Sequence, residues 1–525
     1  MSISPFKARF ADGGGAVETW SGLNGSSAAI AILAAAEADA GVSLVVTRSS
    51  HQAQLLNRDL ELLDHTGLPV QLFPDHETLP YDPFSPHPDI IAERLRTLSS
   101  LSDMQHGIVL CPVTSLIQRL PPASYILQRT FDLSVGQHLA IDEFRRKLNH
   151  AGYEASDQVY QAGQYAIRGS VIDLFPAGSP SPYRLDLFDE EIDSIREFDP
   201  ESQRSIGKVP RIVMLPAREY PCDEAGLEAF RRAFRYRFDV DTRRVTLYQD
   251  LRSGAHPQGL EQYLPLFYDE TSSLLDYLET APRLILYDGV YEAAENHQRR
   301  TLERWEQRRH DVERPVLDPE ELFYPPDALR LRLESLDTVY LPAQDSKAPA
   351  RPVFNTKPAP DVHIHERGKE AAADLVEFLD EFDGRVLFAA DTPGRREVLR
   401  TTLGAFDVKP LQLDSFRDFL AGDKRTGLAI LPVDEGFVIP DELALITESQ
   451  LFGGRSRPKA RRAVSERDPE SIIRNLTDLV EGAPVVHEDH GVGRYLGLET
   501  LEIDQRPAEF LMLEYAGGDK LYVPV

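Results

Sequence analysis

Hydrophobic and polar residues alternate along residues 163–205 with the two-residue period of β-strands. The pattern predicts four short strands separated by turns that contain glycine, proline or acidic residues, at 164–168, 171–175, 183–188 and 192–198. The third strand places Arg184, Asp186 and Phe188 on one face. An aromatic ring beside an arginine is typical of protein interfaces, so this face is a candidate docking surface. The alternative is a solvated face with Phe188 covered by a loop.

Elsewhere the pattern alternates between apolar strands and amphipathic helices, which favours parallel sheets covered by helices. In residues 15–120 it predicts strands at 42–47, 69–73 and 107–111 and helices at 51–63 and 90–101. Strands at 211–215 and 283–287 and a helix at 290–309 are expected to complete this first sheet. The alternation returns with helices at 368–382 and 395–403 and strands at 385–390 and 427–432. From residue 485 onward, strands with glycine turns predict a small β-barrel.

Composition narrows the possible partners. The 525-residue chain has a formal net charge of −28, which disfavours tight, sequence-independent DNA binding and favours protein partners. Its two cysteines, Cys111 and Cys222, cannot form a disulfide framework and lack metal-site spacing, so a reducing cytoplasm is the expected location. The alanine-rich run 28–40 is interrupted by Glu37 and Asp39, and we infer neither export nor a membrane span.

Several stretches carry a resemblance to a known family. Residues 163–205 resemble the small domain with which UvrB and the transcription-repair coupling factor Mfd bind UvrA. The motif LPYDPFSPHPD at 79–89, followed by the helical stretch 90–101, is similar to Mfd in particular. The stretches ITESQLFG at 446–453 and VVHEDHGVGRY at 485–495 are also Mfd-like and have no counterpart in UvrB. The resemblance covers nearly the whole chain.

The resemblance implies a multidomain α/β fold: a degenerate helicase-like parallel-sheet domain with a strand-rich inserted domain, a second small α/β domain and a C-terminal partial β-barrel. The expected segments are a UvrB-like domain at 1–124 and 209–314, an inserted UvrA-binding domain at 125–208, a linker at 315–360 around a strand at 338–341, a small α/β domain at 361–452, a basic linker at 453–479 and an RNA-polymerase-interacting domain at 480–525. We expect the last domain to be truncated at Val525. In Mfd two ATP-driven translocase domains follow, so the motor is expected to lie outside this chain.

No segment has the G-x-x-x-x-G-K-[ST] pattern that cradles phosphates and holds magnesium. The stretch GLNGSSAA at 22–29 stands where UvrB has its P-loop and keeps Gly22 and Gly25, but Ala28 replaces the lysine and Ala29 the hydroxyl residue. We interpret it as a degenerate P-loop; an ordinary turn before a helix is the alternative. Either interpretation predicts no catalytic residue, cofactor or metal in this chain, with ATP and magnesium belonging to the translocase domains.

The other catalytic candidates are weak. The stretch LAILPVDE at 428–435 imitates a Walker B strand, but without a P-loop its acidic pair is interpreted as the start of a loop. His487 and His490 have no third metal ligand nearby, and the Asp-His-Glu run at 75–77 has no partner nucleophile. The basic run RSRPKARR at 455–462 is interpreted as a solvated linker rather than a nucleic-acid contact.

The resemblance therefore implies an adaptor that recruits UvrA to RNA polymerase stalled at DNA damage, in nucleotide excision repair. It assigns UvrA contact to Arg168, Arg184 and Phe188, whose exposed face is expected to contribute little to folding. It assigns contact with the RNA polymerase β subunit to a segment that contains His487, Glu488, His490, Gly491, Val492, Gly493, Arg494 and Tyr495. A hydrophobic residue can stand at position 488 in the family, so an interface with Glu488 needs another anchor. Contact with DNA is expected only through domains outside this chain.

Two other classes of protein stay open. The first is a DNA-loading ATPase of the UvrB type, against which Ala28 and the Mfd-like segments after residue 440 argue. The second is a stand-alone regulatory binding protein that acts without a motor.

Overall fold

The computed structural model describes residues 6, 10, 16–253, 255, 257–343, 353–365, 372–452, 484–487, 491–503, 506–514 and 520–524. Two compact units make up the chain, Met1–Gly453 and Gly454–Val525. The first unit contains two α/β domains, an inserted β-rich domain and a helical lobe, and the second contains one antiparallel sheet.

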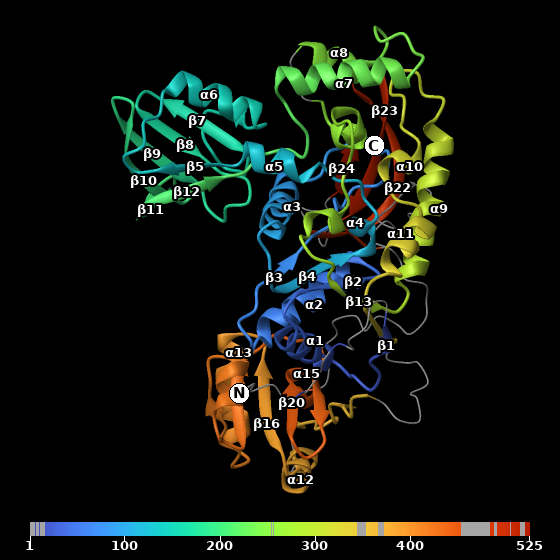
Figure 1. Ribbon diagram of the computed structural model, residues 1–525. Helices are drawn as coiled ribbons and strands as arrows, with labels where there is room; N and C mark the ends of the chain where they lie inside the picture. The colour runs from blue at the N-terminus through green and yellow to red at the C-terminus, as the bar shows by residue number, and fades with distance from the viewer. Residues whose placement is uncertain are drawn as a thin grey trace. The chain divides into compact units, whose positions relative to one another are not determined.

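Six parallel strands form the central sheet of the first unit, in the order β1-β14-β13-β2-β4-β3 (Figure 1). They are β1 (Val17–Thr19), β14 (Thr338–Leu341), β13 (Arg283–Tyr287), β2 (Val42–Thr47), β4 (Gly107–Pro112) and β3 (Val70–Leu72). Helices α1 (Ser27–Ala38) and α2 (Ser50–Leu62) pack on one face, and α3 (Pro88–Leu101), α4 (Val113–Leu116), α5 (Ala123–Arg129) and the start of α9 (Val290–Arg308) pack on the other. Strands covered on both faces are buried throughout, as β2 and β4 are. The predicted parallel sheet is confirmed.

The stretch expected to be a linker contributes to this domain instead. Strand β14 lies between β1 and β13 and pairs with both. Helices α10 (Pro319–Leu322) and α11 (Pro326–Leu333) precede it in the chain. The strand predicted at 338–341 is confirmed as β14. The linker prediction is wrong for residues 319–333, because Pro319 and Pro326 begin helices, where the missing N–H of proline has no intrahelical partner to lose.

Helix α1 packs between two sheets. Its residues 29–36 are all buried, so it is apolar on every side rather than along one stripe. A single apolar cluster joins it to Val45 and Ile285 of the central sheet and to Leu387 and Leu445 of the small α/β domain. The two domains therefore share a core.

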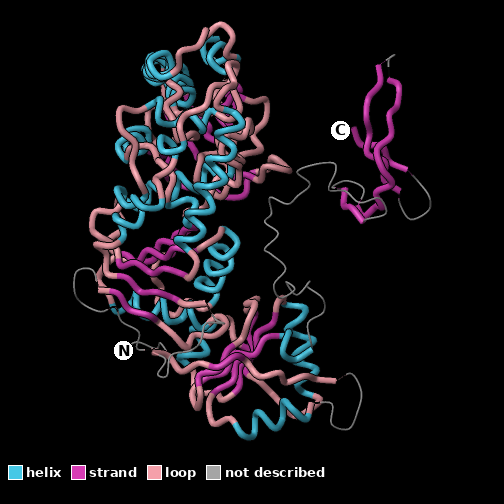
Figure 2. The backbone as a smooth tube through the Cα atoms, turned by 90° about the vertical axis from the view of Figure 1, so that its right-hand side faces the viewer, coloured by secondary structure: helices cyan, strands magenta, loops and turns pink. Residues whose placement is uncertain are grey.

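The small α/β domain is a second sheet flanked by helices, in the order β15-β19-β20-β16-β18-β17 (Figure 2). Its strands are β15 (Lys357–Pro358), β19 (Phe437–Ile439), β20 (Leu443–Thr447), β16 (Arg385–Ala390), β18 (Thr426–Ile430) and β17 (Leu411–Gln412). Its helices are α12 (Ala373–Glu381), α13 (Pro393–Gly404), α14 (Phe416–Ala421) and α15 (Glu448–Phe452). The strand predicted at 385–390 is confirmed as β16. The strand predicted at 427–432 and the helix at 395–403 are confirmed apart from their ends.

The inserted domain is a sheet in the order β11-β10-β9-β8-β7-β6 that packs on helix α6 (Ile141–His150). The strands are β6 (Glu154–Ala155), β7 (Gln164–Arg168), β8 (Val171–Leu174), β9 (Tyr183–Phe188), β10 (Glu191–Phe198) and β11 (Ser205–Val209). The four strands predicted between 163 and 205 are confirmed as β7 to β10.

The strand predicted at 211–215 belongs to the inserted domain and not to the central sheet. Strand β12 (Arg211–Met214) pairs antiparallel with β5 (Phe131–Ser134), and Ile212 and Met214 are buried beside Phe144 of α6. The prediction is wrong because a four-residue apolar strand carries no signal that tells which sheet it joins.

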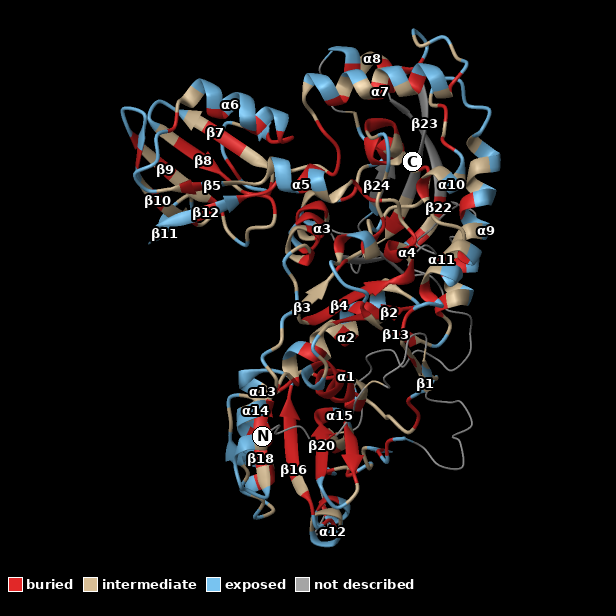
Figure 3. Ribbon diagram, viewed as in Figure 1, coloured by how far each residue is buried: buried red, intermediate tan, exposed pale blue. Residues whose placement is uncertain are grey.

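A helical lobe with an aromatic core follows β12 in the chain (Figure 1). It contains α7 (Glu224–Arg237), α8 (Thr246–Ser253), the 3₁₀ segments η1 (Leu260–Phe267) and η2 (Leu274–Tyr277), and the end of α9. Phe230 and Phe234 of α7 contact Tyr263 of η1. They are fully buried, whereas the opposite side of α7 is exposed (Figure 3).

The second unit is an antiparallel sheet in chain order. Its strands are β21 (Pro484–His487), β22 (Gly491–Ile503), β23 (Arg506–Glu514) and β24 (Lys520–Pro524). The partial β-barrel expected here stays a prediction. In the part of the chain that the structure describes, no helix has the length and apolar character needed to cross a membrane.

Candidate interaction surface of the inserted domain

The sheet of the inserted domain has an apolar face and a charged face. Leu185 and Ile195 lie on the apolar face, where they are buried against α6. Arg184, Asp186 and Phe188 of β9 occupy alternate positions and lie on the opposite face, as the strand period predicts. Directly opposed residues of β8 and β10 extend this charged face over three strands.

A fully buried carboxylate organises the charged face. Asp173 of β8 accepts hydrogen bonds from Arg184 Nε at 2.6 Å and from Arg184 Nη2 at 3.0 Å. Arg168 of β7 donates from Nη2 to the same carboxylate. Two guanidinium groups therefore surround one buried negative charge, which is the condition under which such a charge is tolerated.

Arg184 is held by more than this ion pair. Its side chain is only 20% exposed, and its guanidinium lies 4.9 Å from the centre of the Phe198 ring. Its Nη1 also donates to the carbonyl oxygen of Gln203 at 3.3 Å, and the hydrogen bonds to Asp173 raise the pKa of Arg184. The expectation that this residue contributes little to folding is wrong, because its removal would leave the Asp173 carboxylate short of a buried partner.

A second ion pair continues the charged face toward β10. Asp186 accepts hydrogen bonds from Arg196 Nη2 and from Ser194 Oγ, the latter at 2.8 Å. Each arginine on β7, β9 and β10 is thus paired with an aspartate of a neighbouring strand, and the pairs form a ladder across the sheet. Paired charges of this kind fix one another's rotamers, so the face is rigid.

Two of the three predicted contact residues stay accessible at this ladder. Phe188, at the end of β9, is 75% exposed, and Asp189 turns the chain into β10 with a left-handed φ of 54°. The Arg168 side chain is 47% exposed. The face therefore offers an aromatic ring and a guanidinium on a fixed frame, which are two of the groups that dominate protein interfaces.

The glycine-rich loop before α1 is covered by the small α/β domain. The amide N and the Oγ of Ser26 both donate to the carbonyl oxygen of Glu435, at 3.2 Å and 3.0 Å. Gly25 has a φ of 52°, and a Cβ at this position would lie 2.4 Å from the carbonyl oxygen of Gly436. The backbone here faces protein and leaves no room for a bound group.

The remaining positions of this loop lack the side chains of a P-loop. Gly22 accepts hydrogen bonds at its carbonyl oxygen from the amide N and the Oγ1 of Thr356, at 3.1 Å and 2.8 Å. Ala28 and Ala29 lie in the first turn of α1, and Ala29 is buried. No positive side chain and no metal-binding hydroxyl stands at the positions expected for them.

Carboxylates crowd beside this interdomain contact. Arg58 of α2 pairs with Asp434, at 2.9 Å from Nη2 to Oδ2. Burial raises the pKa of the neighbouring Asp59 to about 6, with further raising by Asp434 and Glu435, although a hydrogen bond from Ser26 and the Arg58 charge lower it. One Asp59 oxygen is buried without a hydrogen-bond partner. The acidic pair that ends the Walker-B-like stretch is therefore part of a domain contact.

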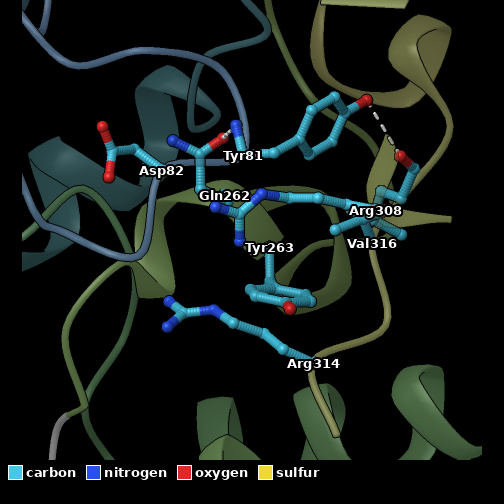
Figure 4. A pocket seen from close by; sticks show the side chains of 8 residues that line it. Tyr81, Asp82, Gln262, Tyr263, Arg308, Arg314 and Val316 are labelled. Atoms are coloured by element: carbon cyan, nitrogen blue, oxygen red, sulfur yellow. Dashed lines mark hydrogen bonds between the residues drawn. The ribbon is translucent and has the colours of Figure 1, made fainter. Parts of the chain in front are cut away.

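The motif at 79–89 has a structural role. Tyr81 is buried with a left-handed φ of 63°, and its N–H donates to Gln262 Oε1 at 3.1 Å. Its hydroxyl donates to the carbonyl oxygen of Leu317 at 3.0 Å (Figure 4). Beside it lies a small pocket lined in part by Arg308 and Arg314 (Figure 4). The motif thus fastens the central domain to η1 and to the segment that follows α9.

The Asp-His-Glu run at 75–77 also belongs to the fold. His76 Nε2 lies 2.9 Å from Glu219 Oε2, and the fully buried Arg94 donates from Nε to Glu219 Oε1 at 2.7 Å. Burial alone would raise the pKa of Glu219, but Arg94 and His76 outweigh it and lower the pKa to about 2. The cluster is a buried network of ion pairs that connects residues distant in the sequence. Within the described ranges, no group of three or more metal-binding side chains occurs.

The segment assigned to polymerase contact is described in part. Glu488 and His490 lie outside the described residues. The backbone forms the ladder of β21 and β22, with the pairs His487–Gly491, Val486–Val492 and Val485–Gly493. The Tyr495 side chain is buried opposite Leu513, whereas Arg494 is exposed. Arg494 is accessible to a partner, and Tyr495 supports the packing of this unit.

Three protein-family models match separate parts of the chain. The UvrB interaction domain matches residues 131–220, the MFD D3 domain matches 378–451 and the CarD-like/TRCF RID domain matches 479–525. The first match runs through β12, in agreement with the pairing of β12 and β5. The three together define the class: a multidomain protein built from domains of the UvrB-interaction, MFD D3 and CarD-like/TRCF RID kinds.

Curated relatives identify the family within this class. The transcription-repair-coupling factors of Haemophilus influenzae and Escherichia coli are each 39% identical to the chain and match 95% and 96% of it. The transcription-repair-coupling factor of Bacillus subtilis is 29% identical over 96% of the chain. The chain spans less than half the length of these relatives, 43% to 44%. It corresponds to the N-terminal part of the transcription-repair-coupling factors.

Proposed function

We propose that this region is the adaptor of a transcription-repair-coupling factor. In this proposal the inserted domain docks UvrA, and the C-terminal unit docks the RNA polymerase β subunit. The match to the UvrB interaction domain supports the first contact, and the match to the CarD-like/TRCF RID domain supports the second. Bringing UvrA to a stalled polymerase requires no chemistry in this chain, only two binding surfaces on one scaffold.

The observation that carries the proposal is the exposed Phe188 ring at the end of a fixed ladder of ion pairs. A large apolar ring gains nothing from water, and a partner that buries it gains its full transfer free energy. The ladder of Asp173 and Asp186 with their arginines is already ordered in the free domain. Binding therefore orders few side chains, and less of the interaction energy is lost as entropy.

The three residues assigned to the contact have different tasks in this proposal. Phe188 is the apolar anchor. Arg168, with nearly half of its side chain exposed, presents N–H groups to an acidic or carbonyl group of UvrA. Arg184 is a positioning residue, because its N–H groups are committed to Asp173 and Gln203 and it holds β8 and β9 in register.

The test is calorimetric titration of the 525-residue chain with UvrA. Truncation of a central aromatic anchor costs about 2 kcal/mol, so Phe188→Ala should bind about 30-fold more weakly. Phe84→Ala is the matched control, because Phe84 is 66% exposed but lies outside the inserted domain. Equal UvrA affinity for Phe188→Ala, Phe84→Ala and the unchanged chain would remove the charged face from the proposal.

The polymerase contact has its own test. Arg494→Glu reverses the charge of the accessible residue in the assigned segment and should weaken binding to the isolated β subunit. Lys520→Glu, at another exposed position of the same sheet, is the matched control. If both variants bind the β subunit as the unchanged chain does, the contact lies elsewhere.

We also propose that this chain neither binds nor hydrolyses ATP, against the alternative of a UvrB-type ATPase. Ala28 and Ala29 supply neither charge nor hydroxyl. The loop contacts that hold Glu435, Gly436 and Thr356 support the same conclusion, because a nucleotide would have to displace the small α/β domain. DNA-stimulated ATP turnover that is lost on substitution within 22–29 would contradict this proposal.

A further inference from the structure

Helix α7 has two sides with opposite character. Phe230 and Phe234 are fully buried in the aromatic core of the helical lobe. Arg237 also belongs to this inner side, since its guanidinium pairs with Asp318 and Glu321. These contacts account for the attachment of α7 to the lobe, and none of them uses the outward side.

The outward side carries one isolated aromatic ring. Tyr236 is 94% exposed, and within residues 224–253 it is the one exposed large apolar side chain. Arg232 lies one helical turn before it, and Arg235 is adjacent. Both arginines are exposed. Nothing in the lobe explains why the sequence places a tyrosine here.

Positive charge is concentrated around this ring. Residues 231–244 contain six arginines and two aspartates, in a chain whose net charge is −28. Arg243 is paired with Asp241. Among the described residues, Arg232 and Arg244 have no ion-pair partner within 4 Å, and Arg235 donates only from Nε to the carbonyl oxygen of Arg231. Guanidinium groups are therefore available at the surface beside Tyr236.

We propose that this outward side of α7 binds an unpaired nucleic-acid strand, with Arg232 and Arg235 on two phosphates and Tyr236 stacked on a base. Guanidinium groups match phosphate in a bidentate manner, and base–aromatic stacking needs only one accessible ring. A nucleic-acid strand is favoured over a protein partner, because Arg232 and Arg235 form no ion pair among the described residues, unlike the paired arginines beside Phe188, and phosphates supply the missing negative charge. The site is independent of the UvrA and polymerase contacts proposed above.

The test measures binding of the 525-residue chain to a fluorescein-labelled oligothymidylate by fluorescence anisotropy at low ionic strength, where charge contacts are least screened. Arg232→Ser with Arg235→Ser should raise the apparent Kd about tenfold or more and should lower the salt slope by about 1.4. Tyr236→Ala should raise the Kd about fivefold or more, and Tyr236→Phe should retain binding because the ring still stacks.

A matched control distinguishes binding by this surface from a general effect of removing positive charge. Arg145→Ser with Arg146→Ser removes the same charge from exposed positions of α6 and should leave the Kd unchanged. A labelled duplex separates stacking from phosphate contact alone, because it should respond to the arginine variants and not to Tyr236→Ala. Absence of binding by the unchanged chain at low salt, or equal affinities for the α7 and α6 variants, would overturn the proposal. The proposal would also be overturned if the α7 variants weakened binding of a protein partner and left binding of the oligonucleotide unchanged.

Discussion

The loop at 22–29 and the charged face of the inserted domain both stand where the sequence resembles a functional site, yet only one of them is open. In the loop, the amide N and the Oγ of Ser26 both donate to the carbonyl oxygen of Glu435 in the neighbouring domain. In the inserted domain, the Asp173 carboxylate is paired within the sheet with Arg168 and Arg184, and Phe188 is left exposed.

The difference shows how the fold covers one stretch that resembles a functional site and leaves another exposed. Polar groups that are satisfied from outside their own element close a site, because the group that satisfies them also fills the space. Polar groups that are satisfied by one another leave the surface free and rigid, as Asp173 and its two arginines do. The first arrangement suits a scaffold, and the second suits a docking surface.

The largest effect is expected from Arg184→Ala. The change leaves the buried Asp173 carboxylate with Arg168 as its one remaining cationic partner among the described residues. Removing one partner of a buried ion pair costs about 3 kcal/mol or more, so the urea midpoint of the inserted domain should fall markedly. Arg196→Ala is the comparison. Because its partner Asp186 is partly exposed, this variant should lose about 1 kcal/mol of folding stability or less.

Equal midpoints for these two arginine variants would contradict the assigned difference between a buried and a partly exposed ion pair. UvrA affinity of Arg184→Ala is informative only where the variant is folded, which near-ultraviolet circular dichroism reports.

The next effect concerns Asp59 at the interdomain contact. Its pKa is raised from 3.8 to about 6 in the folded chain, so the protonated form is favoured by folding. The associated stability is present below about pH 4 and is lost as the pH rises through about 6. Asp59→Asn keeps the neutral form at every pH and should stabilise the first unit by up to about 3 kcal/mol at pH 8.

Thermal unfolding at several pH values checks this sign. The variant should melt above the unchanged chain at pH 8, and the two curves should converge near pH 4. A variant that is less stable at pH 8 would mean that the ionised Asp59 contributes a favourable interaction.

A smaller effect is expected from placing P-loop side chains at positions 28 and 29. Ala28→Lys with Ala29→Thr supplies the missing charge and hydroxyl, yet the loop contacts with Glu435 and Gly436 stay in place. Titration with a fluorescent ATP analogue and magnesium should therefore detect no binding. Tight, magnesium-dependent binding by this variant would mean that the side chains alone, and not the covered loop, exclude the nucleotide.

The hydrophobic periodicity predicted the positions of strands and helices better than it predicted which strands pair with one another. Strand β16 was predictable to the residue because its apolar run is bounded by Gly384 and Asp391. The sheets that β12 and β14 join were not, because pairing between distant short strands leaves no local signal. Likewise, the strand period placed Arg184 on the correct face but could not reveal that Asp173, on the next strand, is buried beneath it.

The sequence also could not predict that the small α/β domain covers the loop at 22–29. The sequence alone shows that position 28 has no lysine and position 29 has no hydroxyl residue. It could not show the contact between Ser26 and Glu435, which are more than 400 positions apart. The signal that could have indicated the contact is α1 itself, because a helix without a polar side must be covered all round.

The most direct test of the central claim is hydrogen exchange of the chain with and without UvrA. Binding through the charged face should slow exchange at the β9–β10 turn, from Phe188 to Glu191, because a partner that buries the ring also excludes water from the turn. Exchange at 22–29 should not change. Two results under saturating UvrA would contradict the account. In the first, exchange slows at the loop at 22–29 but not at the β9–β10 turn, and in the second, exchange changes at neither place.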